Sequence, residues 1–387
     1  MKKTLIALTL AALPVASMAE VTLFGTIKGG LEVTKVKGVK NTVTNANDWD
    51  SSIGFKGEED LGNGLKAIWQ LQSKASIDNK SGRNGQRNTL TSFIGLDAGA
   101  FGKVRAGHLP DAIKDMGDLN LDASGHGVRA LDAHWERTGR RHTALRYDTA
   151  NIAGFSANLL YSMEDNQRYD QARNAGFKDL TGLEEGLECG KAKAADCVGQ
   201  DVDGVNAAQM VNVPTRNSWV ASVGLNYTIA GFFVKYGYVH QNDKDDVYNA
   251  HVHRLIGGYD ANNIFVGLGY QHAYGFDGPK VKNDEIVLAA AYRIGNVVPR
   301  FTYAHGFKER KAAPGAVREM GTRYDQVTLG VDYHLSKRTT VISTLGWMKE
   351  GAGRVGDNYI GTVLNDDGTQ RTKEQAYSFG LGLSHKF

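Results

Sequence analysis

From Val21 onward, the chain repeats segments of about ten residues in which apolar side chains alternate with polar or small ones, a length and period typical of membrane-crossing strands. The final segment shows the pattern most clearly, because Tyr377, Phe379, Leu381 and Leu383 share one face of a predicted strand. Sixteen segments show this alternating pattern, at 21–33, 53–55, 65–74, 88–97, 103–108, 142–148, 155–163, 218–227, 232–240, 252–259, 264–271, 285–293, 298–305, 325–333, 339–347 and 375–387. An even number of strands is what an up-and-down barrel requires.

The connections between these segments alternate between short and long. Short polar turns are predicted at 60–64, 98–102, 149–154, 228–231, 260–263, 294–297 and 334–338. The longest of the intervening connections runs over 164–217. This asymmetry predicts an all-β fold, a transmembrane antiparallel β-barrel of 16 strands with short periplasmic turns and long extracellular loops.

A soluble β-sandwich also has strands of alternating polarity, so the chemical character of the two strand faces must distinguish a sandwich from a membrane barrel. The apolar face carries aromatic residues near strand ends, namely Trp69, Tyr147, Tyr161, Trp219, Tyr227, Tyr259, Tyr270, Tyr292, Tyr333 and Trp347. The opposite face carries the bases Lys28, Lys66, Arg105, Arg146, Lys235, Arg254, Arg293 and Arg300. So many charges do not fit a dry core, whereas a water-filled interior accepts them. The pattern therefore favours a barrel with a lipid-facing outside.

The N-terminal residues 1–19 read as a cleaved secretory signal, with Lys2 and Lys3 before an apolar run and small residues before Ala19. The barrel then occupies 20–387. A short buried helix is the alternative for the first segment. The formal net charge of +3 at pH 7 is too small to indicate nucleic-acid binding.

The only two cysteines are Cys189 and Cys197. In an exported chain they predict one possible disulfide within a loop. A metal site would need further ligands close by, so we expect no metal, and nothing indicates a cofactor.

The stretch from Lys103 to Arg146 contains the candidate functional residues. Two predicted strands with bases at Arg105 and Arg146 flank a poorly alternating, aspartate-rich segment at about 109–141. In a closed barrel, a connection of this length can fold into the lumen and face the basic wall. We interpret it as a pore constriction.

Beyond its period, the chain contains sequence motifs that resemble those of the trimeric porins of the neisserial outer membrane. The matching segments are GFKGEEDLGNGLKAIWQL at 54–71, SFIGL at 92–96, FGKVRAG at 101–107, VPR at 298–300, YAHGF at 303–307, SKRT at 336–339 and HKF at 385–387. The resemblance implies a homotrimer in outer-membrane lipid, each barrel having its own channel narrowed by the third long loop. It departs from the family at His108, Gln72 and Ser384, where arginine, glutamate and arginine are usual.

Residues 114–118 look like the constriction segment of that family. The resemblance implies that Lys114, Asp115 and Asp118 face Arg105 and Arg146 on the wall, and Lys66 joins them as a base of the inner face. Charges of both signs in a narrow passage create a transverse field that biases ion entry. Bases outnumber acids on the predicted inner face, which indicates a mild anion preference.

We therefore expect a general diffusion porin for ions and small hydrophilic solutes. An enzyme on a barrel would need a nucleophile or a water-activating site, and His126 and His134 near Asp122 and Asp132 do not form one of the recognised motifs. A solute-specific channel remains an alternative. The long loop at 164–217 keeps a surface receptor or adhesin open as another.

Overall fold

A computed structural model describes residues 20–40, 42–78, 89–117, 119, 121, 135, 138–162, 219–242, 249–275, 281–307, 310–311, 323–351 and 373–387. The predicted signal segment 1–19, the connection 164–217 with Cys189 and Cys197, and Asp118 lie outside these residues. Among the described residues, no helix is both long and apolar enough to cross a bilayer.

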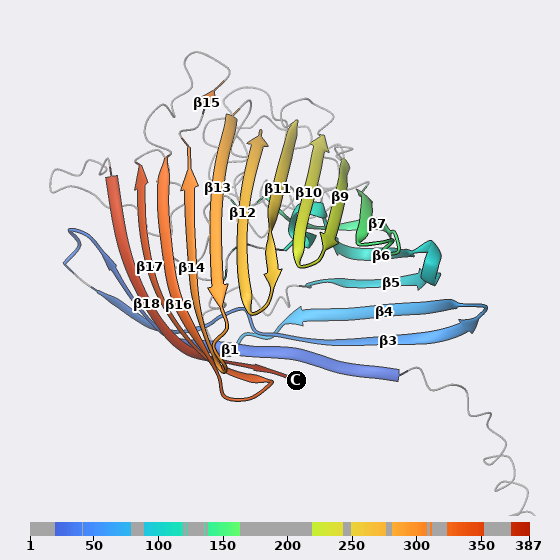
Figure 1. The fold of residues 1–387 in the computed structure, drawn as a ribbon, viewed down its shortest axis with the longest axis horizontal. Coiled ribbons are helices and arrows are strands. Elements are labelled where there is room, and N and C mark those ends of the chain that lie inside the picture. The colour runs from blue at the N-terminus through green and yellow to red at the C-terminus, as the bar shows by residue number, and fades with distance from the viewer. Residues whose placement is uncertain are drawn as a thin grey trace, which may run out of the picture.

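The described chain is almost entirely β-strand, and every strand pairing in it is antiparallel (Figure 1). The first nine strands are β1 (Glu20–Val36), β2 (Val43–Asp48), β3 (Ser52–Gly62), β4 (Leu65–Lys74), β5 (Ser92–Asp97), β6 (Lys103–Pro110), β7 (Arg141–Asp148), β8 (Phe155–Ser162) and β9 (Trp219–Ile229). The rest are β10 (Phe232–Asn242), β11 (Ala250–Ala261), β12 (Ile264–Tyr274), β13 (Val281–Tyr292), β14 (Val297–Gly306), β15 (Arg310–Lys311), β16 (Tyr324–His334), β17 (Thr339–Gly351) and β18 (Lys373–Lys386). Two short helices complete the described elements, η1 (Gly99–Phe101) and α2 (Ala112–Asp115).

These 18 segments form 16 barrel strands. Both β2 and β3 pair with β1, and both β14 and β15 pair with β13, so each of these couples is one interrupted strand. The interruption between β2 and β3 includes Asp50, a non-glycine residue at φ 66°. The predicted 16-strand antiparallel barrel is confirmed.

The first and last strands close the barrel. β1 and β18 pair from Thr26 opposite Lys386 to Val36 opposite Ala376. At the chain end, the Gly25 amide donates to the Phe387 carbonyl at 3.0 Å and the Phe387 amide donates to the Gly25 carbonyl at 3.2 Å. Closure pairs the two strands that would otherwise be sheet edges, and unpaired backbone groups would be costly in hydrocarbon.

The short turns have the backbone conformation that tight hairpins need. Ala230 and Gly231 have φ values of 49° and 85°, and Asn262 and Asn263 have 53° and 65°. Two successive residues at positive φ are the signature of the hairpin turn whose twist matches that of the strands. These turns lie at one end of the barrel, as predicted.

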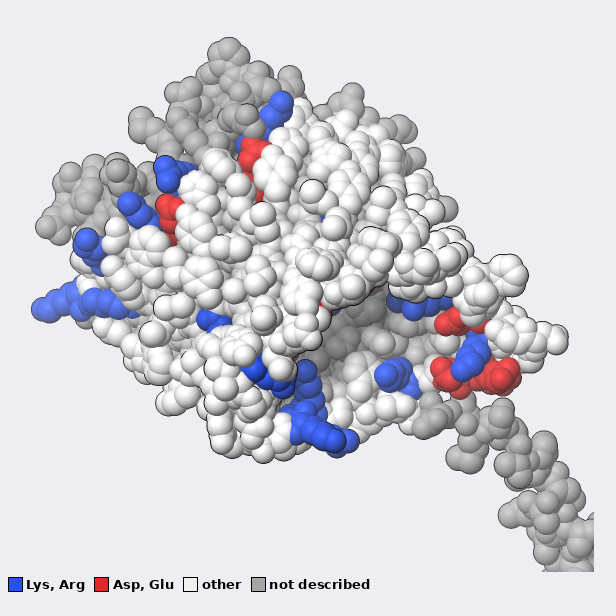
Figure 2. Space-filling view, viewed as in Figure 1, with Lys and Arg blue, Asp and Glu red and all other residues white. Residues whose placement is uncertain are grey.

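The alternation places apolar side chains outside. Leu381 and Leu383 on β18 are 45% and 52% exposed, whereas Ser378 and Ser384 on the same strand are buried. On the neighbouring β17, Leu345 is also exposed. Figure 2 shows mostly uncharged atoms over the strands, with a group of charged side chains beside a hollow in this face. The exposed apolar face is the one that the sequence assigns to lipid.

Candidate pore constriction

Loop 3, which we define as the connection 111–140 between β6 and β7, begins with the single turn of α2. Asp111 caps this helix, because its Oδ1 accepts from the Lys114 amide at 2.8 Å. Its Oδ2 accepts from the Arg140 amide, also at 2.8 Å, so one carboxylate joins the start and the end of the loop. Asp111 is fully buried, with His142 Nε2 at 3.4 Å from Oδ2.

Two arginines of the inner wall meet at one carboxylate. Arg105 on β6 and Arg146 on β7 are register partners, and Asp148 bridges them. Asp148 Oδ2 accepts from Arg105 Nη2 at 2.7 Å, and Oδ1 accepts from Arg146 Nη2 at 2.7 Å. This shared acid relieves the repulsion that two directly opposed bases would otherwise produce.

Arg146 also holds loop 3. Its Nη1 donates to the Pro110 carbonyl at 2.7 Å, and its Nη2 donates to Asp115 Oδ2 at 2.6 Å. Arg146 is 2% exposed, and such a buried guanidinium requires partners of this kind. Asp115 and Arg146, which the resemblance places on facing sides of the constriction, therefore form a direct ion pair, with no open passage between the two groups.

The remaining predicted residues lie around this centre. The Asp115 side chain is 37% exposed, and Lys114 beside it is exposed as well. Lys66 lies beside the short turn between β3 and β4, where its Nζ is 2.7 Å from Glu58 Oε1. The structure therefore brings Asp115, Arg105 and Arg146 together, and places Lys66 at the short-turn end of the inner wall.

A row of alternating charges connects Lys66 with the arginine pair. Lys66 on β4 is opposite Asp97 on β5, Asp97 is opposite Lys103 on β6, and Lys103 is opposite Asp148 on β7. Opposite charges on neighbouring strands stabilise a sheet and order the side chains. The inner wall thus presents acids and bases in alternation below loop 3.

The far side of loop 3 is held through its backbone carbonyls. Lys235 Nζ on β10 donates to the Met116 carbonyl at 2.8 Å. Arg254 Nη2 on β11 donates to the Trp135 carbonyl, and its guanidinium lies 4.2 Å from the Trp135 ring centroid. On β14, Arg300 Nη1 donates to the Leu121 carbonyl.

Apolar side chains of loop 3 fill spaces above glycines of the same wall. A Cβ at Gly269 on β12 would lie 2.5 Å from the Trp135 ring and 2.8 Å from Leu119 Cδ1. A Cβ at Gly237 on β10 would lie 3.0 Å from Ile113 Cδ1. These glycines let the loop side chains approach the sheet closely.

The sequence places Lys235, Arg254 and Arg300 on the inner face, but it does not reveal that they bind loop 3. Main-chain carbonyls have no sequence signature, so this part of the site was missed. The alternation of Gly267, Leu268 and Gly269 could have indicated it, because two inward glycines leave room for a packed loop. Among the described residues, no group of three or more histidine, cysteine or acidic side chains could hold a metal ion.

Comparison with known proteins agrees with this architecture. Residues 26–368 match the Gram-negative porin family. The major outer membrane protein P.IB of Neisseria sicca is 36% identical, and the alignment covers 100% of both chains.

Two solved structures share the fold. An anion-selective porin from Comamonas acidovorans has a TM-score of 0.64 at 18% identity, covering 95% of this chain and 100% of that chain. OmpT of Vibrio cholerae, solved in trimer form, has a TM-score of 0.56 at 12% identity, covering 95% of this chain and 99% of that chain. The barrel, the inner loop and the match across most of the chain lead to one conclusion: this chain belongs to the Gram-negative porin family and is an outer-membrane porin.

Proposed function

We propose that loop 3 forms the constriction of a general diffusion channel for ions and small hydrophilic solutes, and that the chain is a channel and not an enzyme. The observation that carries this proposal is the double attachment of loop 3. Asp111 and Arg146 hold it at β6 and β7, and Lys235 holds it at β10. A segment tied to the wall on both sides keeps a fixed cross-section.

Within this constriction, we assign Asp115 and Asp118 to the acidic side and Arg105 and Arg146 to the basic side. Lys114 is exposed and adds a base beside Asp115. Lys66 contributes at the short-turn end of the wall. Bases outnumber acids on the predicted inner face, and the part of this excess that is not buried against loop 3 supports a mild anion preference.

Reversal potentials in a planar bilayer with a salt gradient test these assignments. Replacing Asp115→Asn and Asp118→Asn together removes negative charge from the constriction, so the reversal potential is expected to move toward that of anions. Glu59→Gln is a matched control, because Glu59 lies in β3 beside a short turn and, by parity, faces outward opposite Ala67. An unchanged reversal potential in the double variant would remove the two aspartates from the constriction.

Liposome swelling separates the candidate functions. A general diffusion porin gives permeation rates that fall gradually with solute size. Saturation by one sugar would instead indicate a solute-specific channel, and the absence of permeation would indicate a receptor or adhesin.

We also propose that three copies assemble, as the resemblance to trimeric porins implies. Native mass spectrometry of the detergent-solubilised protein is expected to give a trimer of the mature chain. A monomer under the same conditions would contradict this assembly.

A further inference from the structure

Histidines gather on the outer face of the barrel near its long-loop end. They lie between β10 and β14, with His240 on β10, His251 and His253 on β11, His272 on β12 and His305 on β14, and β13 separates the last two. We call these five residues the outer histidine patch. Four of its rings are in contact around His251, whose centroid lies 6.5 Å from that of His240, 5.7 Å from that of His253 and 6.5 Å from that of His272. The ring of His305 lies further along the sheet, against Phe307.

Two members of the patch, His272 and His305, each lie in a group of the same composition, which contains a tyrosine, a histidine and an aspartate. On β12, the Tyr270 hydroxyl donates to Asp284 Oδ1 at 2.5 Å, and His272 Nδ1 lies 2.8 Å from the same oxygen. The tyrosine and the histidine are two residues apart on one strand, and the aspartate is on the next strand, β13.

The arrangement recurs on β14 and β16. The Tyr303 hydroxyl donates to Asp325 Oδ1 at 2.9 Å, and His305 Nδ1 lies 2.7 Å from that oxygen. An ionised carboxylate can only accept hydrogen bonds, so Nδ1–H is the donor in both cases. The Nε2 atom of each ring is then left for another partner.

Further bases surround the two carboxylates. Lys282 on β13 lies over the Tyr274 ring at 5.9 Å from its centroid, and Lys349 on β17 is opposite Asp325. Arg323 lies 3.9 Å from Asp325 Oδ2. Even when the histidines are uncharged, the three bases Lys282, Arg323 and Lys349 outnumber the two acids. The described outer face at this level therefore carries a net positive charge.

The patch lies where the apolar outer surface ends. On β12, the outward residues Ile264, Val266 and Leu268 are exposed, and His272 follows them on the same face beyond Tyr270. From Ile264 to His272 the strand advances about 26 Å along its own axis, and a tilt of about 40° turns this into about 20 Å along the membrane normal, against an apolar band of about 25 Å. His272 therefore lies at the outer edge of this band, where long polar side chains reach the outer-leaflet headgroups.

We propose that the outer histidine patch binds the phosphate groups of an outer-leaflet lipid. The carboxylates of Asp284 and Asp325 orient the rings of His272 and His305 through Nδ1, and the protonated Nε2–H groups donate to phosphate oxygens. Charge-assisted hydrogen bonds of this kind are among the stronger polar contacts. Lys282, Arg323 and Lys349 supply the surrounding positive charge.

The proposal predicts binding that depends on pH in a definite direction. A ring whose Nδ1–H is held by a carboxylate can donate from Nε2 only when it carries a second proton. The ring gains this second proton as the pH falls. A phosphate monoester loses negative charge as the pH falls toward its second pKa of about 6. Tighter binding at the lower pH therefore runs against the titration of the lipid and reports on the protein.

Native mass spectrometry of the purified protein, titrated with lipid A or with dephosphorylated lipid A, tests the proposal. We expect the phosphorylated lipid to bind about fivefold more tightly at about pH 6 than at about pH 7.5. His272→Gln combined with His305→Gln is expected to weaken its binding about tenfold and to abolish the pH dependence. Equal binding of the two lipids, or unchanged binding by the double variant, would overturn the proposal.

A matched control removes two histidines at the opposite end of the barrel. His334 and His385 contact the hydroxyls of Thr340 and Thr339 and no carboxylate is their partner in these contacts. His334→Gln combined with His385→Gln is expected to bind lipid A like the parent protein. Equal losses in the two double variants would show that histidine number, and not the patch, determines binding.

A second variant separates orientation by the carboxylates from simple charge. Asp284→Ala combined with Asp325→Ala removes two negative charges, so a purely electrostatic surface would bind lipid A more tightly. We expect weaker binding and a smaller pH dependence, because the rings also lose the acceptors that orient them. Tighter binding would contradict the role assigned to the two aspartates.

Discussion

Loop 3 is attached to the barrel in two regions whose chemistry differs. At β6 and β7, the wall recognises side chains of the loop, since Arg146 pairs with Asp115 and the Asp111 carboxylate joins the two ends of the loop. At β10 to β14, the wall recognises the backbone, since Lys235 and Arg254 donate to the carbonyls of Met116 and Trp135.

This difference shows that a base on the inner face can have one of two roles. Arg254 and Arg300 are 3% and 7% exposed, and each donates to a loop carbonyl, so they fix the loop in place. Lys114 and Asp115 remain exposed to the interior. The number of bases on the inner face therefore overstates the positive charge that a passing ion meets, because buried bases already have partners.

We call the attachment at β6 and β7 the near region and the attachment at β10 to β14 the far region. The largest expected effect comes from filling the space above Gly269 in the far region. Gly269→Val places atoms where the Trp135 ring and Leu119 now lie, 2.5 Å and 2.8 Å from the position of the added Cβ. Overpacking of this kind costs about 1 to 3 kcal/mol, which would displace loop 3 and raise single-channel conductance.

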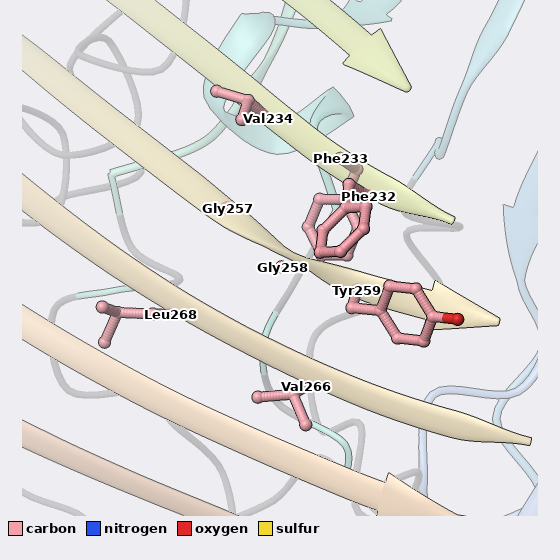
Figure 3. A pocket seen from close by; sticks show the side chains of 8 residues that line it. All are labelled: Phe232, Phe233, Val234, Gly257, Gly258, Tyr259, Val266 and Leu268. Carbon is pink, nitrogen blue, oxygen red and sulfur yellow. The ribbon is translucent and has the colours of Figure 1, made fainter. Parts of the chain in front are cut away.

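Gly257→Val is the matched control for this prediction. Gly257 also lies in a central strand, but it faces the outside, where Figure 3 shows an apolar notch between Val234 and Leu268. The nearest neighbour of an added Cβ there is a backbone oxygen at 3.7 Å, an ordinary contact. Parent-like conductance in both variants would show that the far region does not fix the loop.

An intermediate effect is expected in the near region. Asp111→Ala removes the acceptor of two backbone amides, those of Lys114 and Arg140, and the loss of a helix cap alone costs about 1 kcal/mol. The far region still holds the loop, so we expect the mean conductance to be retained with larger current fluctuations. Asp111→Asn keeps a capping oxygen and is expected to show smaller fluctuations than the alanine variant. Equal noise in both would argue against the cap.

The smallest effect is expected at Lys66. Its ion pair with Glu58 is exposed on both sides, at 45% and 58% of the side chains, and exposed pairs contribute little to stability. Lys66→Gln should leave assembly and conductance unchanged and shift the reversal potential slightly toward that of cations. A shift larger than that of the Asp115 and Asp118 double variant would move the selective region to the short-turn end.

The sequence predicts the barrel well because lipid imposes a strict requirement on every second residue. Leu381 and Leu383 had to be apolar, and the predicted strand positions at 375–387 follow from them. The segment Val43–Asp48 was not predicted as a strand, because its outward positions include Thr44 and Ala46 and the alternation is weak. Its pairing with β1 depends on the whole sheet.

The site was predictable only in part. The charges of Asp115 and Arg146 indicate a pair, and the resemblance to neisserial porins places them on loop 3 and on the wall. The bond between Lys235 and the Met116 carbonyl could not be predicted, since any residue supplies a carbonyl. The position of Trp135 over Gly269 depends on how the loop folds back, which local pattern does not determine.

A disulfide trap between loop 3 and the far wall tests the attachment most directly. Met116 Sδ lies 3.1 Å from the position of a Cβ at Gly237, so the side chain of residue 116 already points at this position, and Met116→Cys with Gly237→Cys puts one thiol on each side of the contact, in a background with Cys189→Ser and Cys197→Ser. The structure predicts that oxidation closes the disulfide without changing single-channel conductance, because the loop already lies there. Failure to form the disulfide, or a conductance that changes once it forms, would contradict the attachment of loop 3 described above.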